Sequence, residues 1–115
     1  MVPVLAGPWS TNQRGYGHAR PTTVFNGGDP TGLVQHIRWK TWGGARAIGV
    51  GTGWYVGPHQ STAEGTQEPV RIVVFQLGYC HGRRAYEAIE WYFPQHGGRF
   101  QPNSYIEACT GEYHE

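Results

Sequence analysis

The strongest constraint on the fold of this chain is a stretch in which every second residue is very small. The small residues are Ala45, Ala47, Gly49, Gly51 and Gly53, and larger residues stand between them. Alternation with a period of two is typical of a β-strand, because successive side chains point to opposite faces of the sheet. Glycine weakens a strand interior, so a face made of small residues requires a structural reason. We expect either the close approach of a large aromatic ring or a bulge or sharp bend.

The segment before this stretch supplies two candidate rings. Residues 33–42 also alternate, with Trp39 on one face and Trp42 on the other, and Gly43-Gly44 is typical of a two-residue hairpin connection. Either tryptophan could then lie over the small residues across the hairpin. The pattern leaves open which face is the core. If the Trp39 face is the core, Trp42 and Trp54 are exposed; if the Trp42 face is the core, the small residues are exposed instead.

Other segments predict further short strands. Residues 70–77 are rich in β-branched side chains and predict a central strand, while residues 22–26 and 105–106 predict shorter ones. Residues 85–93 fit both a helix and a strand, and their aromatic side chains favour a strand. Residues 57–69 are polar and predict a loop. Short strands separated by glycine-rich turns predict an all-β fold, a single small antiparallel β-sandwich or barrel.

The length of 115 residues fits one domain, and we find no internal repeat and no linker within residues 1–115. Residues 1–21 predict an irregular arm, which Trp9 and Tyr16 should hold against the body. Aromatic residues make up 14% of the chain, and their large apolar area can stabilise a small core that has few leucines and isoleucines.

Two cysteines, Cys80 and Cys109, predict one disulfide, the alternative being two free buried thiols. Such a bridge would stabilise the fold by roughly 3–4 kcal/mol, and it indicates an oxidising setting outside the cytoplasm. No apolar run approaches the length of a membrane-spanning helix. Residues 1–6 lack the basic start and the long apolar stretch of a signal peptide. Because the predicted disulfide indicates an oxidising compartment, we expect a secreted protein from which the signal peptide has been removed.

The order of the motifs resembles a group of secreted actinobacterial proteins of unknown function. The shared order is NGGDPTG, IRWKTWGG, ARAIGVGTGW, VRIVVFQL and AYEAIEWYFP, across residues 22–93. The most specific part is the tryptophan strand, the WGG turn and the alternating Ala/Gly strand, from Trp39 to Gly53. The resemblance implies a small secreted β domain and supplies no active site. Many members carry a cysteine pair in the loop after the Ala/Gly strand, and residues 57–69 of this chain have no cysteine.

Charge and histidine spacing exclude two classes of ligand. The net charge is +1, which argues against a nucleic-acid binder because such a protein normally presents a basic face. None of the six histidines has the close spacing of a metal site, so we predict no metal and no cofactor. Cys80 and His81 adjoin, but neighbouring side chains of an extended chain point apart.

The remaining functional signal is aromatic. Exposed rings bind sugars or protein partners, and Trp42 and Trp54 are exposed if the Trp39 face is the core. We expect Trp42, Trp54 and Tyr55 to stack on such a ligand. Arg38 and Arg46 would add hydrogen bonds to a ligand stacked on these rings. The sequence therefore favours a non-enzymatic secreted binding module for a cell-wall or environmental polysaccharide or for a protein partner. The alternative for these rings is that they pack internally.

One alternative function is a small secreted hydrolase. Glu87 and Glu90 are the close pair of carboxylates in an ordered segment; a helix would place them on one face and a strand on opposite faces. A glycosidase needs two carboxylates beside a cleft. This function would require a deep pocket and a carboxylate with a displaced pKa.

A third function is a secreted inhibitor or an interbacterial effector. It would present the loop of residues 57–69 to a target protein.

Overall fold

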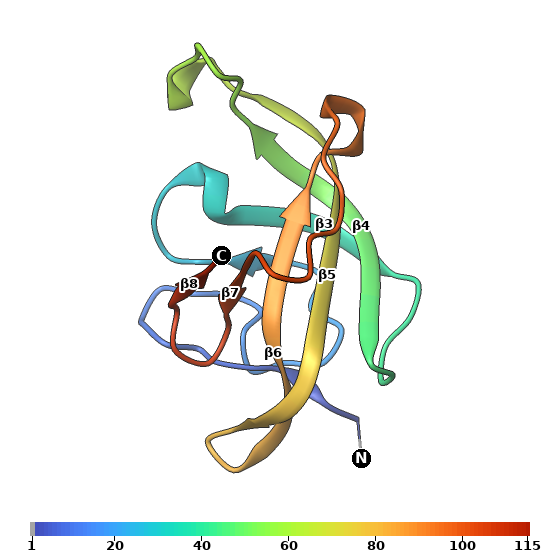
Figure 1. Cartoon of the computed structure of the whole chain (residues 1–115). Helices are drawn as coiled ribbons and strands as arrows, with labels where there is room; N and C mark the ends of the chain where they lie inside the picture. The colour runs from blue at the N-terminus through green and yellow to red at the C-terminus, as the bar shows by residue number, and fades with distance from the viewer. Residues whose placement is uncertain (1) are drawn as a thin grey trace.

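The computed structural model describes residues 2–115, and in it the chain is all-β (Figure 1). The strands are β1 (Val4–Leu5), β2 (Val24–Phe25), β3 (Leu33–Trp39), β4 (Arg46–Tyr55), β5 (Thr66–Cys80), β6 (Arg83–Tyr92), β7 (Tyr105–Glu107) and β8 (Tyr113–His114). The helical turns are η1 (Pro30–Gly32), η2 (Thr62–Glu64) and η3 (Pro94–His96). Within residues 2–115, no helix has the length and apolar character needed to cross a membrane.

The strands form one sheet in the order β2-β3-β4-β5-β6-β7-β8, with antiparallel neighbours throughout. Strand β1 lies off this path and pairs with β6 in parallel. Buried side chains from β1 to β6 belong to one core cluster, so the sheet curls around them in the manner of a small, partly open barrel. The predicted all-β antiparallel fold is confirmed. Residues 85–93 lie mostly in strand β6, as their aromatic side chains favoured.

The small residues of β4 face the core. Ala47 is fully buried, and a Cβ on Gly49 would stand only 3.0 Å from the ring of Trp39. A Cβ on Gly51 would meet the side chain of Ile37 at 3.1 Å. The missing side chains therefore let residues of β3 lie across β4, and the expected close approach of Trp39 is confirmed. This contact also decides which face of the hairpin is the core.

Strand β3 contains a bulge that the alternation did not reveal. Gln35 pairs with Thr52, but Arg38 pairs with Val50, so β3 has one residue more than β4 between these pairs. His36 has a φ of 55°, in the left-handed region. After the extra residue, each side chain of β3 points to the face opposite to the one that strict alternation would give it. Val34 and Ile37 consequently share one core, although a strict period of two assigned them to opposite faces.

The connection between β3 and β4 is longer than predicted. Strand β3 ends at Trp39 and β4 begins at Arg46, so residues 40–45 form the loop and the two-residue turn at Gly43-Gly44 is wrong. The hydroxyl of the fully buried Tyr86 accepts a hydrogen bond from the amide of Gly43 at 2.8 Å and donates to the carbonyl of Gly44 at 2.7 Å. This tertiary contact fixes a wider loop than the glycine pair alone would form.

Strand β5 changes face at Gln76, which has a φ of 59°. Val74 before it and Leu77 after it both pack on the main core. On the opposite face, Val73 and Phe75 belong to a second, smaller cluster together with Ala88 of β6. The sheet therefore has apolar side chains on both faces at the middle of β5 and β6, and the candidate site is built on the second face.

The disulfide between Cys80 and Cys109 is present, as predicted, with 5.8 Å between the two Cα atoms. It joins the end of β5 to the turn between β7 and β8. The segment before residue 21, for which the sequence indicates an irregular arm, contributes β1 and several buried side chains, among them Leu5 and Tyr16.

Candidate functional site

A groove with a volume of about 440 Å³ lies beside the free edge of β6, and we call it the β6-edge groove. Strand β7 pairs with β6 only at Ala88 and Ile89, so the described part of the chain places no β7 partner beside Glu90, Trp91 and Tyr92. The lining residues come from β6, from the turn before β3 and from the C-terminal segment: Asn26, Thr31, Gly32, Ile89, Glu90, Trp91, Tyr92, Gly98, Arg99, Gln101, Ser104, Tyr105, Ile106 and Tyr113.

The second apolar cluster positions one wall of this groove. Phe75 of β5 meets the rings of Phe100 and Tyr105 edge-on, at centroid distances of 5.0 and 5.4 Å. The guanidinium of Arg46 lies 4.4 Å from the centroid of Phe100 on the same face. These contacts hold residues 99–105 over the outer face of the sheet, so polar side chains of that segment reach the free edge of β6.

Glu90 is the acidic side chain that lines the groove. It pairs with Val73 of β5, so it stands on the outer face, and its Oε1 accepts a hydrogen bond from the backbone amide of Gln101 at 3.1 Å. Partial burial raises the pKa of Glu90 because it disfavours the charged form, and the hydrogen bond from Gln101 opposes this effect. Among the described residues that line the groove, Glu90 is the one acid and Arg99 the one base.

Aromatic side chains give the groove its apolar surface. Tyr113 is 64% exposed, and its hydroxyl lies 2.9 Å from the Oγ of Ser104. Tyr105 stacks on His114 at a centroid distance of 4.7 Å. Trp91 packs partly on the main core and also borders the groove. Rings beside hydrogen-bonding groups fit a ligand that has both an apolar face and a polar edge.

The structure does not bring the sequence-predicted binding residues into one site. Trp42 turns inward: its Nε1 donates to the carbonyl of Pro3 at 2.9 Å, and its ring meets Trp39 edge-on at 4.7 Å. Trp54 donates from its Nε1 to the carbonyl of Thr62 at 2.8 Å, within its own hairpin.

The other three predicted binding residues have separate surroundings. Tyr55 stacks on His96 at a centroid distance of 3.6 Å, Arg46 lies over Phe100, and Arg38 is exposed on β3. Arg46 and Trp54 stand at opposite ends of β4, about 26 Å apart at the usual rise of a strand. A single ligand stacked on all of these groups would have to span the length of the sheet.

The two candidate carboxylates also separate. Glu87 accepts a hydrogen bond at its Oε2 from the amide of Tyr79 at 2.9 Å, whereas Glu90 borders the groove. They stand three residues apart on β6, and of the two only Glu90 lines the groove. The groove therefore contains one of the two carboxylates that a glycosidase requires.

A second polar cluster ties η3 to the β4–β5 hairpin. Glu68 lies 2.6 Å from the Nε2 of His96, and it accepts hydrogen bonds from the Oγ1 of Thr66 at 2.7 Å and from the Nε2 of Gln95 at 3.1 Å. These contacts lower the pKa of Glu68 to about 2, and the hydrogen bond from Thr66 is the largest cause. The stacking of Tyr55 on His96 completes the cluster. Its groups bind one another, so we assign it a role in positioning the hairpin.

One cluster of metal-ligand residue types occurs among residues 2–115. It contains Cys80, His81 and Cys109, whose ligand atoms lie within 4.8 Å of one another. The two sulfur atoms are joined in the disulfide and are not thiolates, which are the form of cysteine that binds a metal.

Sequence reasoning missed the groove because its walls come from segments far apart in the chain. A local signal does exist in residues 98–113, which combine Arg99, Gln101 and Ser104 with Tyr105 and Tyr113. This mixture of aromatic and hydrogen-bonding side chains in a loop is typical of a binding surface.

Comparisons with protein-family models, with curated proteins and with solved structures find no match to this chain. The geometry of the groove is therefore the basis on which a function can be proposed.

Proposed function

We propose that this protein is a non-enzymatic secreted binding module and that its β6-edge groove takes a saccharide. The observation that supports the proposal is that aromatic rings and hydrogen-bonding side chains line the same open groove. A sugar ring has an apolar C–H face that can stack on Tyr113 and a rim of hydroxyl groups. Glu90 can accept hydrogen bonds from those hydroxyls, and Arg99 can donate to them.

The open shape of the groove favours a polymer over an isolated small molecule. The groove runs beside a strand edge and is not enclosed, so a chain of sugar units could continue beyond it. A cell-wall or environmental polysaccharide is thus the ligand class that we propose. The Cys80–Cys109 disulfide supports a site of action outside the cytoplasm, because disulfides persist in oxidising compartments.

A direct test is a pull-down of the purified protein on cellulose, chitin and isolated bacterial cell wall, followed by titration of any bound polysaccharide in soluble form. Trp91 borders the groove, so its fluorescence should shift when the ligand binds. Binding without a shift in emission would place the ligand elsewhere on the surface. Failure to bind every polysaccharide in the panel would overturn the proposal.

The hydrolase is the second candidate, and one observation favours it: Glu90 stands in the groove with a raised pKa. A raised pKa is a property that glutamates acting as general acids share. The lack of a second carboxylate among the described lining residues argues against it. Product analysis after long incubation with each bound polysaccharide separates the two functions, because a binding module leaves the chain length of the polymer unchanged.

A further inference from the structure

The two sulfur atoms of the disulfide have different surroundings. Cys80 is 5% exposed and lies at the end of β5, where its Sγ accepts a hydrogen bond from the backbone amide of Gly7 at 3.4 Å. Cys109 is half-buried in the turn between β7 and β8. An attacking thiol therefore reaches Cys109 more easily, and the sulfur of Cys80 already has a donor in place for a negative charge.

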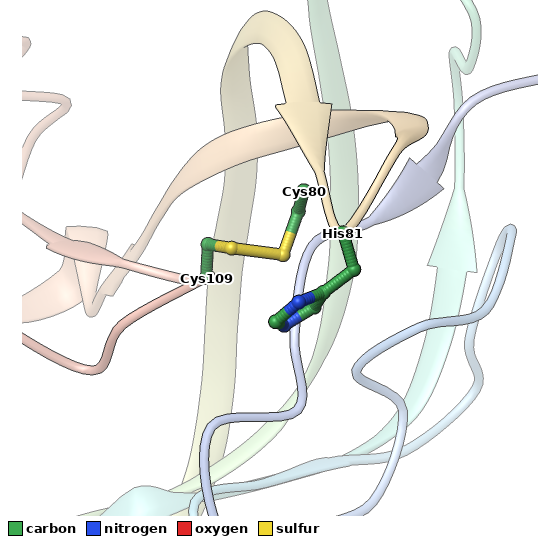
Figure 2. Close-up of side chains that lie close together, drawn as sticks. All are labelled: Cys80, His81 and Cys109. Atoms are coloured by element: carbon green, nitrogen blue, oxygen red, sulfur yellow. A yellow bond between two sulfur atoms is a disulfide. The ribbon is translucent and has the colours of Figure 1, made fainter.

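His81 faces this disulfide. The sequence predicts that the side chains of Cys80 and His81 point apart, but His81 has a φ of 52° in the turn after β5. The left-handed conformation folds the imidazole back toward the sulfur atoms (Figure 2). A ring nitrogen of His81 and both sulfurs lie within 4.8 Å of one another. A positive φ is uncommon for a residue other than glycine, so this direction of the side chain follows from the turn itself.

The hairpin also carries a cation on the residue paired with Cys80. Arg83 is the cross-strand partner of Cys80, and its guanidinium reaches the carbonyl of Gly17 at 3.4 Å. Cations and N–H donors near a sulfur atom stabilise its thiolate form. The amide of Gly7 and the imidazole of His81, which lie beside the sulfur of Cys80, therefore favour the thiolate that forms when the S–S bond breaks.

We propose that Cys80–Cys109 is an exchange-competent disulfide that accepts small thiols of the glutathione type at Cys109. The incoming thiolate attacks the Sγ of Cys109 and forms a new S–S bond with it, while the Cys80–Cys109 bond breaks. The bonding electron pair leaves on the Sγ of Cys80, which accepts the N–H of Gly7 and an N–H or a proton from His81. One thiol is consumed, one cysteine is freed and one mixed disulfide is formed, so the step needs no other oxidant or reductant.

The test measures both the position and the rate of this reaction. The folded protein is incubated with reduced glutathione at neutral pH, quenched with acid at intervals, alkylated and analysed by peptide mass spectrometry. We expect glutathione on Cys109 and the alkyl group on Cys80 in the first adduct. An adduct found first on Cys80, an equal distribution between the two cysteines, or no adduct at either would overturn the proposal.

The matched variants are His81→Asn and His36→Asn. Both histidines are exposed and have a left-handed φ, of 52° and 55°, and asparagine tolerates that conformation best among residues with a side chain. Both variants should therefore keep their turns, but only His81 stands beside the disulfide. We expect His81→Asn to slow adduct formation about fivefold or more, through the loss of its stabilisation of the Cys80 thiolate, and His36→Asn to react like the parent protein. Equal rates for the two variants would show that His81 has no part in the exchange.

Discussion

The backbone carbonyl oxygen of Gln35 stands over Gly51, only 2.7 Å from the position that a Cβ on Gly51 would occupy. This contact joins the bulge of β3 to the small-residue face of β4. A backbone atom cannot move aside as a flexible side chain can, so the glycine at this position is required by the packing of the two strands.

Gly51→Ala should destabilise the protein by about 1–3 kcal/mol, because the added methyl group forces β3 and β4 apart. The matched control is Gly44→Ala, whose Cβ would meet nothing within 4 Å; its effect should stay within about 0.5 kcal/mol. Urea unfolding followed by tryptophan fluorescence measures both. Equal midpoints for the two variants would contradict the packing argument.

Trp42→Phe should lower the free energy of unfolding by about 1–3 kcal/mol, from the lost hydrogen bond to Pro3 and the smaller ring. Its binding to a polysaccharide should stay unchanged, because Trp42 packs on the core and is not among the residues that line the groove. Denaturation and a binding titration on the same preparation check the two statements. If the variant keeps its stability but no longer binds the polysaccharide, the binding site lies on the β3–β4 hairpin.

Tyr113→Ala should weaken saccharide binding by about 1 kcal/mol, or about fivefold in Kd, through loss of one stacking ring. Tyr79→Ala is the control, since Tyr79 is 66% exposed against 64% for Tyr113 but does not border the groove. Isothermal titration of both variants against one soluble oligosaccharide is the measurement. If the two variants bind equally well, the ligand does not stack on Tyr113.

Glu68 should titrate with a midpoint near 2 when its carboxyl carbon is followed by NMR. Its folded pKa lies below the unfolded value, so its contribution to stability is present above about pH 4.5 and is lost as the pH falls toward 2. Thr66→Val removes the largest cause of the shift and should raise the pKa of Glu68 toward 4.5. A midpoint that stays near 2 in this variant would assign the shift to Gln95 and His96 instead.

Local patterns in the sequence were sufficient for much of the fold. The β-branched residues of β5 and the row of small residues in β4 predicted strands, since side-chain alternation is a property of the strand alone. The pairing of Cys80 with Cys109 needed no more than the presence of two cysteines in a small domain.

The candidate site could not be predicted in the same way. The sequence indicates Glu90 as a candidate catalytic carboxylate. Its groove, however, forms only because Phe75 holds residues 99–105 over the outer face of the sheet. Sequence spacing contains no information about which distant segment will cover a strand edge. The partial burial of Trp42 could not be predicted for the same reason, because its hydrogen-bond partner Pro3 lies 39 residues earlier in the chain.

The sequence by itself determined that this chain forms strands, that β4 has one face without large side chains and that its cysteines can pair. Only the tertiary structure decided where the phase of a strand reverses, as at His36, and where a side chain leaves the strand pattern, as at His81. The physical reason is that periodicity describes a regular backbone, whereas a single residue with a positive φ changes the direction of every side chain after it. A period of two in the sequence does not reveal where such a residue stands.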